Sequence, residues 1–110
     1  MILFKSEHAS MIINGTKTQT RRLGKKRWNV GAIHQCQTKL FDNHSVFAKV
    51  RILDVYSERL MDISYADAQS EGGYSVDEYK AVWERINGMW ITALFVWVVK
   101  FELVKEVNHD

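Results

Sequence analysis

The ten residues from Leu94 to Leu103, LFVWVVKFEL, constrain the fold more than any other part of this sequence. They are rich in aromatic and β-branched side chains, which favour extended strands. The run is too short and too continuous for anything but a strand that is well buried. The sequence therefore predicts that a buried strand ends the folded part of the chain.

Capping and turn signals divide the rest of the chain into short elements. They predict an edge strand over 1–5, a helix over 6–14 capped by Ser6, strands over 32–40 and 46–56, and helices over 65–71 and 76–87. The two central strands are joined by an Asp-Asn turn and indicate an antiparallel hairpin. Strands outnumber helices in this order, so we expect a single α+β domain over residues 1–110. Its sheet should be curved and mostly antiparallel, closed as a small β-barrel with flanking short helices.

A strongly basic stretch lies between Gly15 and Trp28, GTKTQTRRLGKKRW. It holds six of the fifteen basic residues and no acid. Residues 1–41 carry eight basic residues and one acid, whereas 42–110 carry seven basic residues and twelve acids. Such asymmetry predicts one positive face, which is a common feature of nucleic-acid-binding proteins. The alternative is a solvated basic loop that serves only solubility.

The first half of this stretch is expected to leave the first helix directly as a strand. Alternation would place Lys17, Gln19 and Arg21 on one side and Thr18, Thr20 and Arg22 on the other. Lys17 and Thr20 therefore fall on opposite nominal faces. A bulge, or the twist at the helix exit, would be needed to bring both into one cleft.

The segment Ile12 to Arg22, IINGTKTQTRR, resembles the ASCH domain family of the PUA-like superfamily. That family has an apolar pair, a glycine and then Lys-Thr-x-Thr-x-Arg. Four later segments also resemble features of the family and occur in the same order. They are Val30-Gly31, the acidic stretch 60–71 with Gly72-Gly73-Tyr74, WERINGMW at 83–90 and the closing VWVVKFEL.

The resemblance implies a PUA-like β-barrel with a central cleft, located in the cytoplasm and associated with RNA or nucleotide ligands. One branch of the family consists of small amidohydrolases that remove the acetyl group from acetylated cytidine. Its catalytic lysine, threonine and glutamate fall here on Lys17, Thr20 and Glu71. Where those amidohydrolases tend to continue with acidic residues, this chain has the basic segment 23–28, so it resembles a different branch.

The three matched residues allow an amide hydrolysis. A desolvated Lys17 with a lowered pKa could accept the Thr20 proton and make Thr20 a nucleophile. Glu71 could protonate the leaving nitrogen or hold Lys17. The alternative is that Thr20 is an ordinary strand residue, Lys17 binds an anion and Glu71 is a helix-end carboxylate.

The basic residues predict a second kind of contact. Phosphates could be bound by Arg21, Arg22, Lys25, Lys26 and Arg27. Trp28 could stack on a base or, equally, anchor its loop on the barrel.

The remaining reactive residues indicate no metal or cofactor. The four histidines, which are His8, His34, His44 and His109, show no ligand spacing and are expected to be surface or sheet residues. The single cysteine, Cys36, lies in a strand pattern as a small apolar residue, and it favours a reducing, cytoplasmic location. The longest apolar run is far too short for a membrane helix.

Two functions follow from these observations. The first is recognition of RNA or a modified nucleoside in a cleft bounded by residues 15–28 and Glu71, extended to hydrolysis of an acylated cytidine amide. The second is a non-catalytic module that binds RNA or single-stranded DNA through the basic loop 21–28. A regulatory protein with a protein partner is a third possibility.

Overall fold

The computed structural model describes residues 1–105. Its elements are β1 (Ile2–Leu3), α1 (Ser6–Ile13), β2 (Gln19–Arg22), β3 (Ile33–Gln37), β4 (Val46–Arg59), α2 (Tyr65–Gly72), α3 (Val76–Asn87) and β5 (Phe95–Leu103), with 3-10 turns at Asn43–Ser45 and Leu60–Asp62. The predicted order of strands and helices is confirmed. None of the helices in this range is long and apolar enough to span a bilayer.

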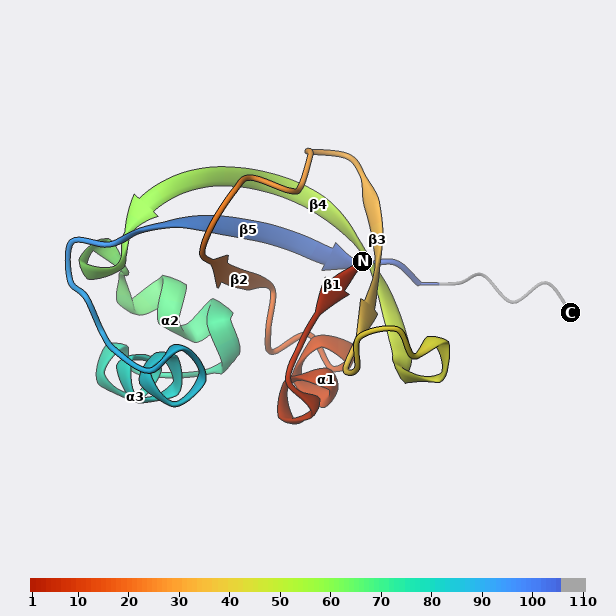
Figure 1. Cartoon of the computed structure of the whole chain (residues 1–110), viewed down its shortest axis with the longest axis horizontal. Coiled ribbons are helices and arrows are strands. Elements are labelled where there is room, and N and C mark those ends of the chain that lie inside the picture. The colour runs from red at the N-terminus through yellow and green to blue at the C-terminus, as the bar shows by residue number, and fades with distance from the viewer. Residues whose placement is uncertain (106–110) are drawn as a thin grey trace, which may run out of the picture.

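The five strands form one sheet in the order β1-β3-β4-β5-β2. Only β1 and β3 are parallel, and the β3–β4 hairpin is antiparallel as predicted. The sheet curls, but within residues 1–105 its edge strands β1 and β2 do not pair with each other. The α+β PUA-like fold is therefore confirmed, but the expected closure of the barrel is wrong, because the sheet is open between β1 and β2 (Figure 1).

The long strand β4 supplies much of the curvature. Its pairing with β5 shifts register between Ile52 and Asp54, so Leu53 is an extra residue on the β4 side. A bulge of this kind bends a strand and increases its twist. Figure 1 shows β4 and β5 arching together over the helices.

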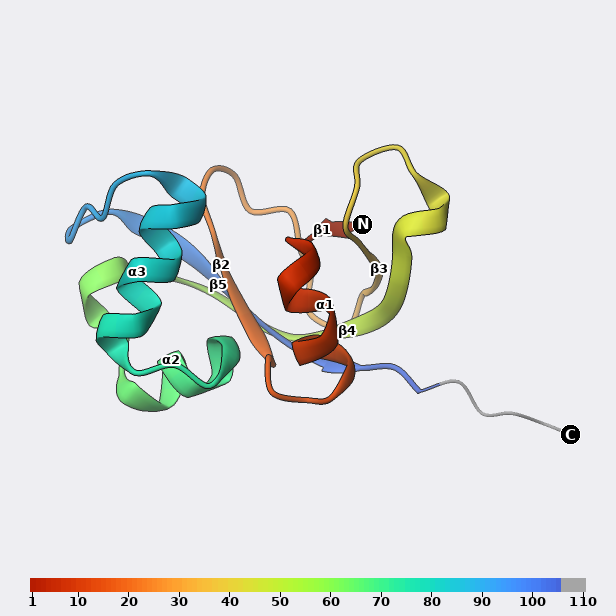
Figure 2. The same cartoon turned by 90° about the horizontal axis from the view of Figure 1, so that it is seen from below.

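β5 lies between β4 and β2, and both of its faces are buried. Val99 and Phe101 pack in one buried cluster with Ile12 of α1. Val96, which points to the other face, packs in a second cluster with Trp83 of α3. This confirms the prediction from LFVWVVKFEL and places α1 on one face of the sheet and α2 with α3 on the other, with β2 between them (Figure 2).

Two of the three helices begin with a serine capping box. Capping boxes open α2 at Ser64 and α3 at Ser75. The predicted Ser6 cap is wrong, because Ser6 is already the first helical residue and Lys5 occupies the cap position without a side-chain hydrogen bond. At the other end of α1 the chain turns through Gly15, whose φ of 84° explains the glycine there.

Trp28 belongs to the core and not to the surface. Only 7% of it is exposed, and it packs in the cluster that contains Cys36 and Val50. The ring therefore cannot stack on a base, and the alternative that it anchors its loop is correct. Cys36 is fully buried beside it, and burial raises the pKa of its thiol to about 11, as expected of an inert core residue.

Replacing Trp28 with alanine should cost about 3 kcal/mol of unfolding free energy, because a large buried ring is lost and a cavity remains. Asn29→Ala, a change at the exposed neighbouring residue, is the control and should change stability by less than about 0.5 kcal/mol. Chemical denaturation of the two variants measures the difference. Equal stabilities would contradict the anchoring role.

Candidate active site

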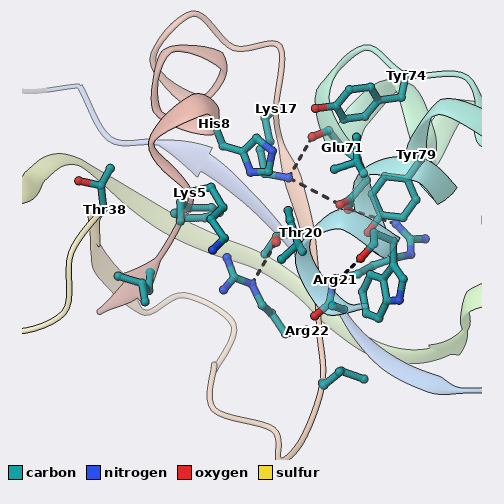
Figure 3. Close-up of a pocket in the computed structure, with 17 residues that line it drawn as sticks. Lys5, His8, Lys17, Thr20, Arg21, Arg22, Thr38, Glu71, Tyr74 and Tyr79 are labelled. Atoms are coloured by element: carbon teal, nitrogen blue, oxygen red, sulfur yellow. Dashed lines mark hydrogen bonds and ion pairs between the residues drawn. The ribbon is translucent and has the colours of Figure 1, made fainter. Parts of the chain in front are cut away.

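A cavity of about 240 Å³ lies at the free edge of β2, between α1 and the pair α2 and α3 (Figure 3). Lys17, Thr20 and Glu71 all line it. The structure therefore brings together the three residues that the sequence proposed as a catalytic set, although Glu71 is more than fifty positions away from Lys17.

Lys17 and Thr20 reach the same cavity without a bulge. The strand begins only at Gln19, so Lys17 precedes it and is not subject to its alternation. The backbone N–H of Lys17 donates to Met11 of α1, and that of Thr18 donates to Ser70 of α2. The segment before β2 is thus held between two helices, and the prediction that the strand leaves directly from the end of the first helix is wrong. Because β2 is an edge strand, residues of both its faces border the cavity.

Lys17 is held tightly by Glu71. Its Nζ donates to the main-chain oxygen of Glu71 at 2.9 Å and lies 3.6 Å from the carboxylate Oε1. The Lys17 side chain is only 4% exposed and that of Glu71 only 2%. Burial lowers the pKa of Lys17, and nearby Arg22 and Arg21 lower it further against the opposing effect of Glu71. The lowered pKa makes loss of the ammonium proton easier than in an exposed lysine, and only the neutral amine can act as a base.

Arg21 is a structural cation and not a surface contact for phosphate. Its side chain is completely buried and forms ion pairs with Glu58 at 2.8 Å, Asp67 at 3.4 Å and Glu71 at 3.2 Å. The prediction that Arg21 binds nucleic acid is therefore wrong. Its partners lie on β4 and α2, far from it in sequence, so no local pattern could have revealed them.

Arg22 lies on the other face of β2 and contacts Thr20. Its Nε donates to the Thr20 hydroxyl oxygen at 3.1 Å, and its guanidinium carbon lies 4.8 Å from the centre of the Phe4 ring. Burial lowers the pKa of Arg22. No carboxylate in the described part of the chain forms an ion pair with it. Thr20 thus has a cationic donor on its oxygen.

His8 lines the cavity from α1, which sequence reasoning missed. It is 6% exposed, so the expectation of a surface residue is wrong, whereas His109 lies outside the described residues. Desolvation, helped by the charge of Lys17, lowers the pKa of His8 to about 4, so the ring is neutral at pH 7. His8 lies four residues before Ile12, so both fall on the buried side of α1. This helical spacing is the sequence signal that could have revealed the burial of His8.

The opposite wall comes from α3. Tyr79 and Trp83 line the cavity one helical turn apart. Burial, together with the charge of Glu71, raises the pKa of Tyr79, so its phenol is neutral. The wall on this side is aromatic and uncharged. Among residues 1–105 no cluster of His, Cys, Asp or Glu could hold a metal ion.

The low pKa of His8 predicts a specific pH dependence of stability. The unfolded chain takes up a proton near pH 6.5, but folded His8 does so only near pH 4, so folding is progressively disfavoured as the pH falls between these values. From pH 7.5 to pH 5 this residue should cost about 2 kcal/mol. His8→Leu should lose less stability than the wild type over that interval in urea denaturation. Parallel losses in the two proteins would contradict the assignment.

Comparisons with known proteins identify the fold. No family model and no curated protein matches the sequence. Among solved structures, a protein of Enterococcus faecalis V583 described under the family model DUF984 is 16% identical, with a TM-score of 0.69 over 94% of this chain and 76% of that one.

Two ASCH structures are similar as well. The ASCH domain from Lactobacillus crispatus JV V101 is 15% identical, with a TM-score of 0.60 over 86% of this chain and 69% of its own. ASCH from Zymomonas mobilis is 14% identical, with a TM-score of 0.64 over 97% of this chain and 71% of its own. At these identities the likeness concerns the fold, and the chain has the fold of an ASCH domain, as the motif at residues 12–22 predicts.

Proposed function

We propose that the cavity binds a modified nucleoside and hydrolyses an acyl amide on its base, such as that of acetylcytidine. The observation that carries this proposal is the meeting of Lys17, Thr20 and Glu71 in one cavity. These are the residues that the ASCH-like motif assigns to amide hydrolysis. The aromatic side chains of Tyr79 and Trp83 provide a neutral wall suited to a base.

In the first step Thr20 is the nucleophile. Its hydroxyl oxygen attacks the acyl carbonyl carbon while its proton passes, through one water or the bound substrate, to Lys17, which this step requires as the neutral amine. Within residues 1–105 the two side chains share no hydrogen bond, so the bound substrate or a water completes the path. The Nε–H of Arg22 stabilises the partial negative charge on the threonine oxygen as its proton leaves, while the carbonyl electron pair moves onto the acyl oxygen to form a tetrahedral intermediate.

In the second step the bond between the acyl carbon and the exocyclic nitrogen breaks. The Lys17 ammonium returns its proton to that nitrogen, which leaves as the free amine of cytidine. Water then hydrolyses the acyl ester on Thr20 and releases acetate. Glu71 contacts both Lys17 and Arg21. The sequence left two roles open for Glu71, protonating the leaving nitrogen or holding Lys17, and these contacts support the second.

Turnover of acetylcytidine to cytidine tests this function. Thr20→Ala and Lys17→Ala should each lower kcat/KM by about 100-fold or more, because each removes a group that acts in the transition state. Thr18→Ala is the matched control, since Thr18 is exposed and contributes only its backbone to the site. Thr20→Ser should retain measurable activity. Turnover that survives both alanine changes would overturn the catalytic assignment.

A second candidate function is binding of RNA or single-stranded DNA by the loop beyond the cavity. Lys25, Lys26 and Arg27 are exposed, and in the described chain none forms an ion pair. Trp28 anchors the loop in the core, and Trp97 Nε1 donates to the Gly24 carbonyl at 3.0 Å. The loop is thus a fixed cationic surface, and a nucleic-acid partner would also agree with the cytoplasmic location that we propose.

The loop can be tested with single-stranded RNA at two salt concentrations. Neutralising Lys25, Lys26 and Arg27 to glutamine should weaken binding and reduce the slope of log K against log salt by about 2, as expected for three phosphate contacts. A charge-matched control neutralises three exposed lysines elsewhere, namely Lys39, Lys49 and Lys105. Binding that is independent of salt, or equally weakened in both variants, would remove the loop from the interface.

A further inference from the structure

The charges around the cavity are balanced on one side of β2 and unbalanced on the other. On the α2 side, Arg21 and Lys17 are matched by Glu58, Asp67 and Glu71. On the α1 side, Arg22 and Lys5 line the same cavity, and no acid in residues 1–105 lies within ion-pair distance of either. Two neighbouring arginines therefore differ sharply in their electrostatic surroundings.

From this imbalance we infer that the cavity holds a phosphate between Arg22 and Lys5, so that its ligand is a nucleotide and not a neutral nucleoside. The inference rests on the proposed nucleoside function and specifies its substrate class. It does not depend on the exposed loop, whose cations lie outside the cavity lining.

Arg22 is arranged as a phosphate ligand. Its Nε is used by Thr20 and its plane is supported by the Phe4 ring, so the guanidinium is fixed in position. Its two terminal nitrogens form no hydrogen bond with the described residues. A half-buried guanidinium without a carboxylate is costly unless a ligand provides the negative charge. The free terminal N–H groups match the oxygens of a phosphate.

Lys5 supplies a second cation at the same place. Figure 3 shows its amine pointing toward the guanidinium of Arg22, with both side chains bordering the cavity. Because both cations border one cavity, a single anion bound there could contact both of them. Lys5 is exposed, which places the anion near the mouth of the cavity.

His8 provides a third polar group on the same side. Its ring is neutral at pH 7, and its buried Nε2 has no hydrogen-bond partner among residues 1–105. The carboxylate of Glu7, 3.8 Å from that nitrogen, is already paired with Arg85 at 2.6 Å. As another residue of the cavity lining, the neutral imidazole offers a bound ligand one more polar contact without adding charge. The uncharged wall of Tyr79 and Trp83 leaves the opposite side to the base.

Equilibrium binding of ligands that lack an acyl amide tests this inference separately from catalysis. Isothermal titration at pH 7.5 and constant ionic strength would compare cytidine, 5′-CMP, 3′-CMP and inorganic phosphate. We expect one of the two CMP isomers to bind at least about 10-fold more tightly than cytidine, a preference of about 1.4 kcal/mol. The isomer that binds better identifies the position of the phosphate.

Lys5→Gln should reduce this preference severalfold and leave the affinity for cytidine unchanged. Arg22→Gln should also reduce the preference severalfold. Lys49→Gln, the same charge change at an exposed lysine of β4, should keep it. Because Lys5 is an exposed residue, its variant tests the inference even if Arg22→Gln is poorly folded. Partial recovery in Arg22→Lys would support a charge contact.

Several results would overturn the inference. These are equal affinities for cytidine and both CMP isomers, a preference that survives in both variants, inorganic phosphate binding as tightly as the nucleotide, and no binding of any of the four ligands. A preference for CMP without turnover of acetylcytidine would support this inference and remove the hydrolytic proposal. Turnover of acetylcytidine without a preference for CMP would support the hydrolytic proposal and overturn this inference.

Discussion

The ion network of Lys17, Arg21 and Glu71 is the constraint on which the site depends. Isolated charges cannot be buried in a protein without a large free-energy cost, so each must have partners. Here one carboxylate on α2 holds a lysine ahead of β2 and an arginine within it. The network fixes the distance between the edge strand and α2. It also keeps the Lys17 amine inside the cavity in a desolvated state.

The arrangement divides three basic residues of one short segment into different roles. Lys17 is placed for proton transfer, Arg21 forms ion pairs with three carboxylates, and Arg22 contacts Thr20 and faces the α1 side. This division follows from the position of β2 between helices on both faces of the sheet. A positive stretch that looks uniform in sequence thus becomes a structural cation, a reactive amine and a free guanidinium.

Sequence patterns predicted the order of elements and the buried strand β5, and the ASCH resemblance implied that Lys17, Thr20 and Glu71 share one site, although strand alternation placed Lys17 and Thr20 on opposite faces. These depend on local signals or on a motif with fixed spacing. The burial and ion pairing of Arg21 depend on Glu58 and Asp67, which the fold brings to it from distant segments. The burial of Trp28 depends on how its loop crosses the sheet, and that of His8 on which side of a short helix meets the cavity. None of these is encoded by spacing alone.

The position of the cavity at the free edge of β2 has a consequence for solubility. An edge strand exposes unpaired backbone groups on which another chain can add a strand, and this is a common route to aggregation. β2 is only four residues long, and α1 on one side and α2 with α3 on the other limit the approach of another strand (Figure 2). The helices that form the walls of the cavity therefore also protect the open barrel against association with its own copies.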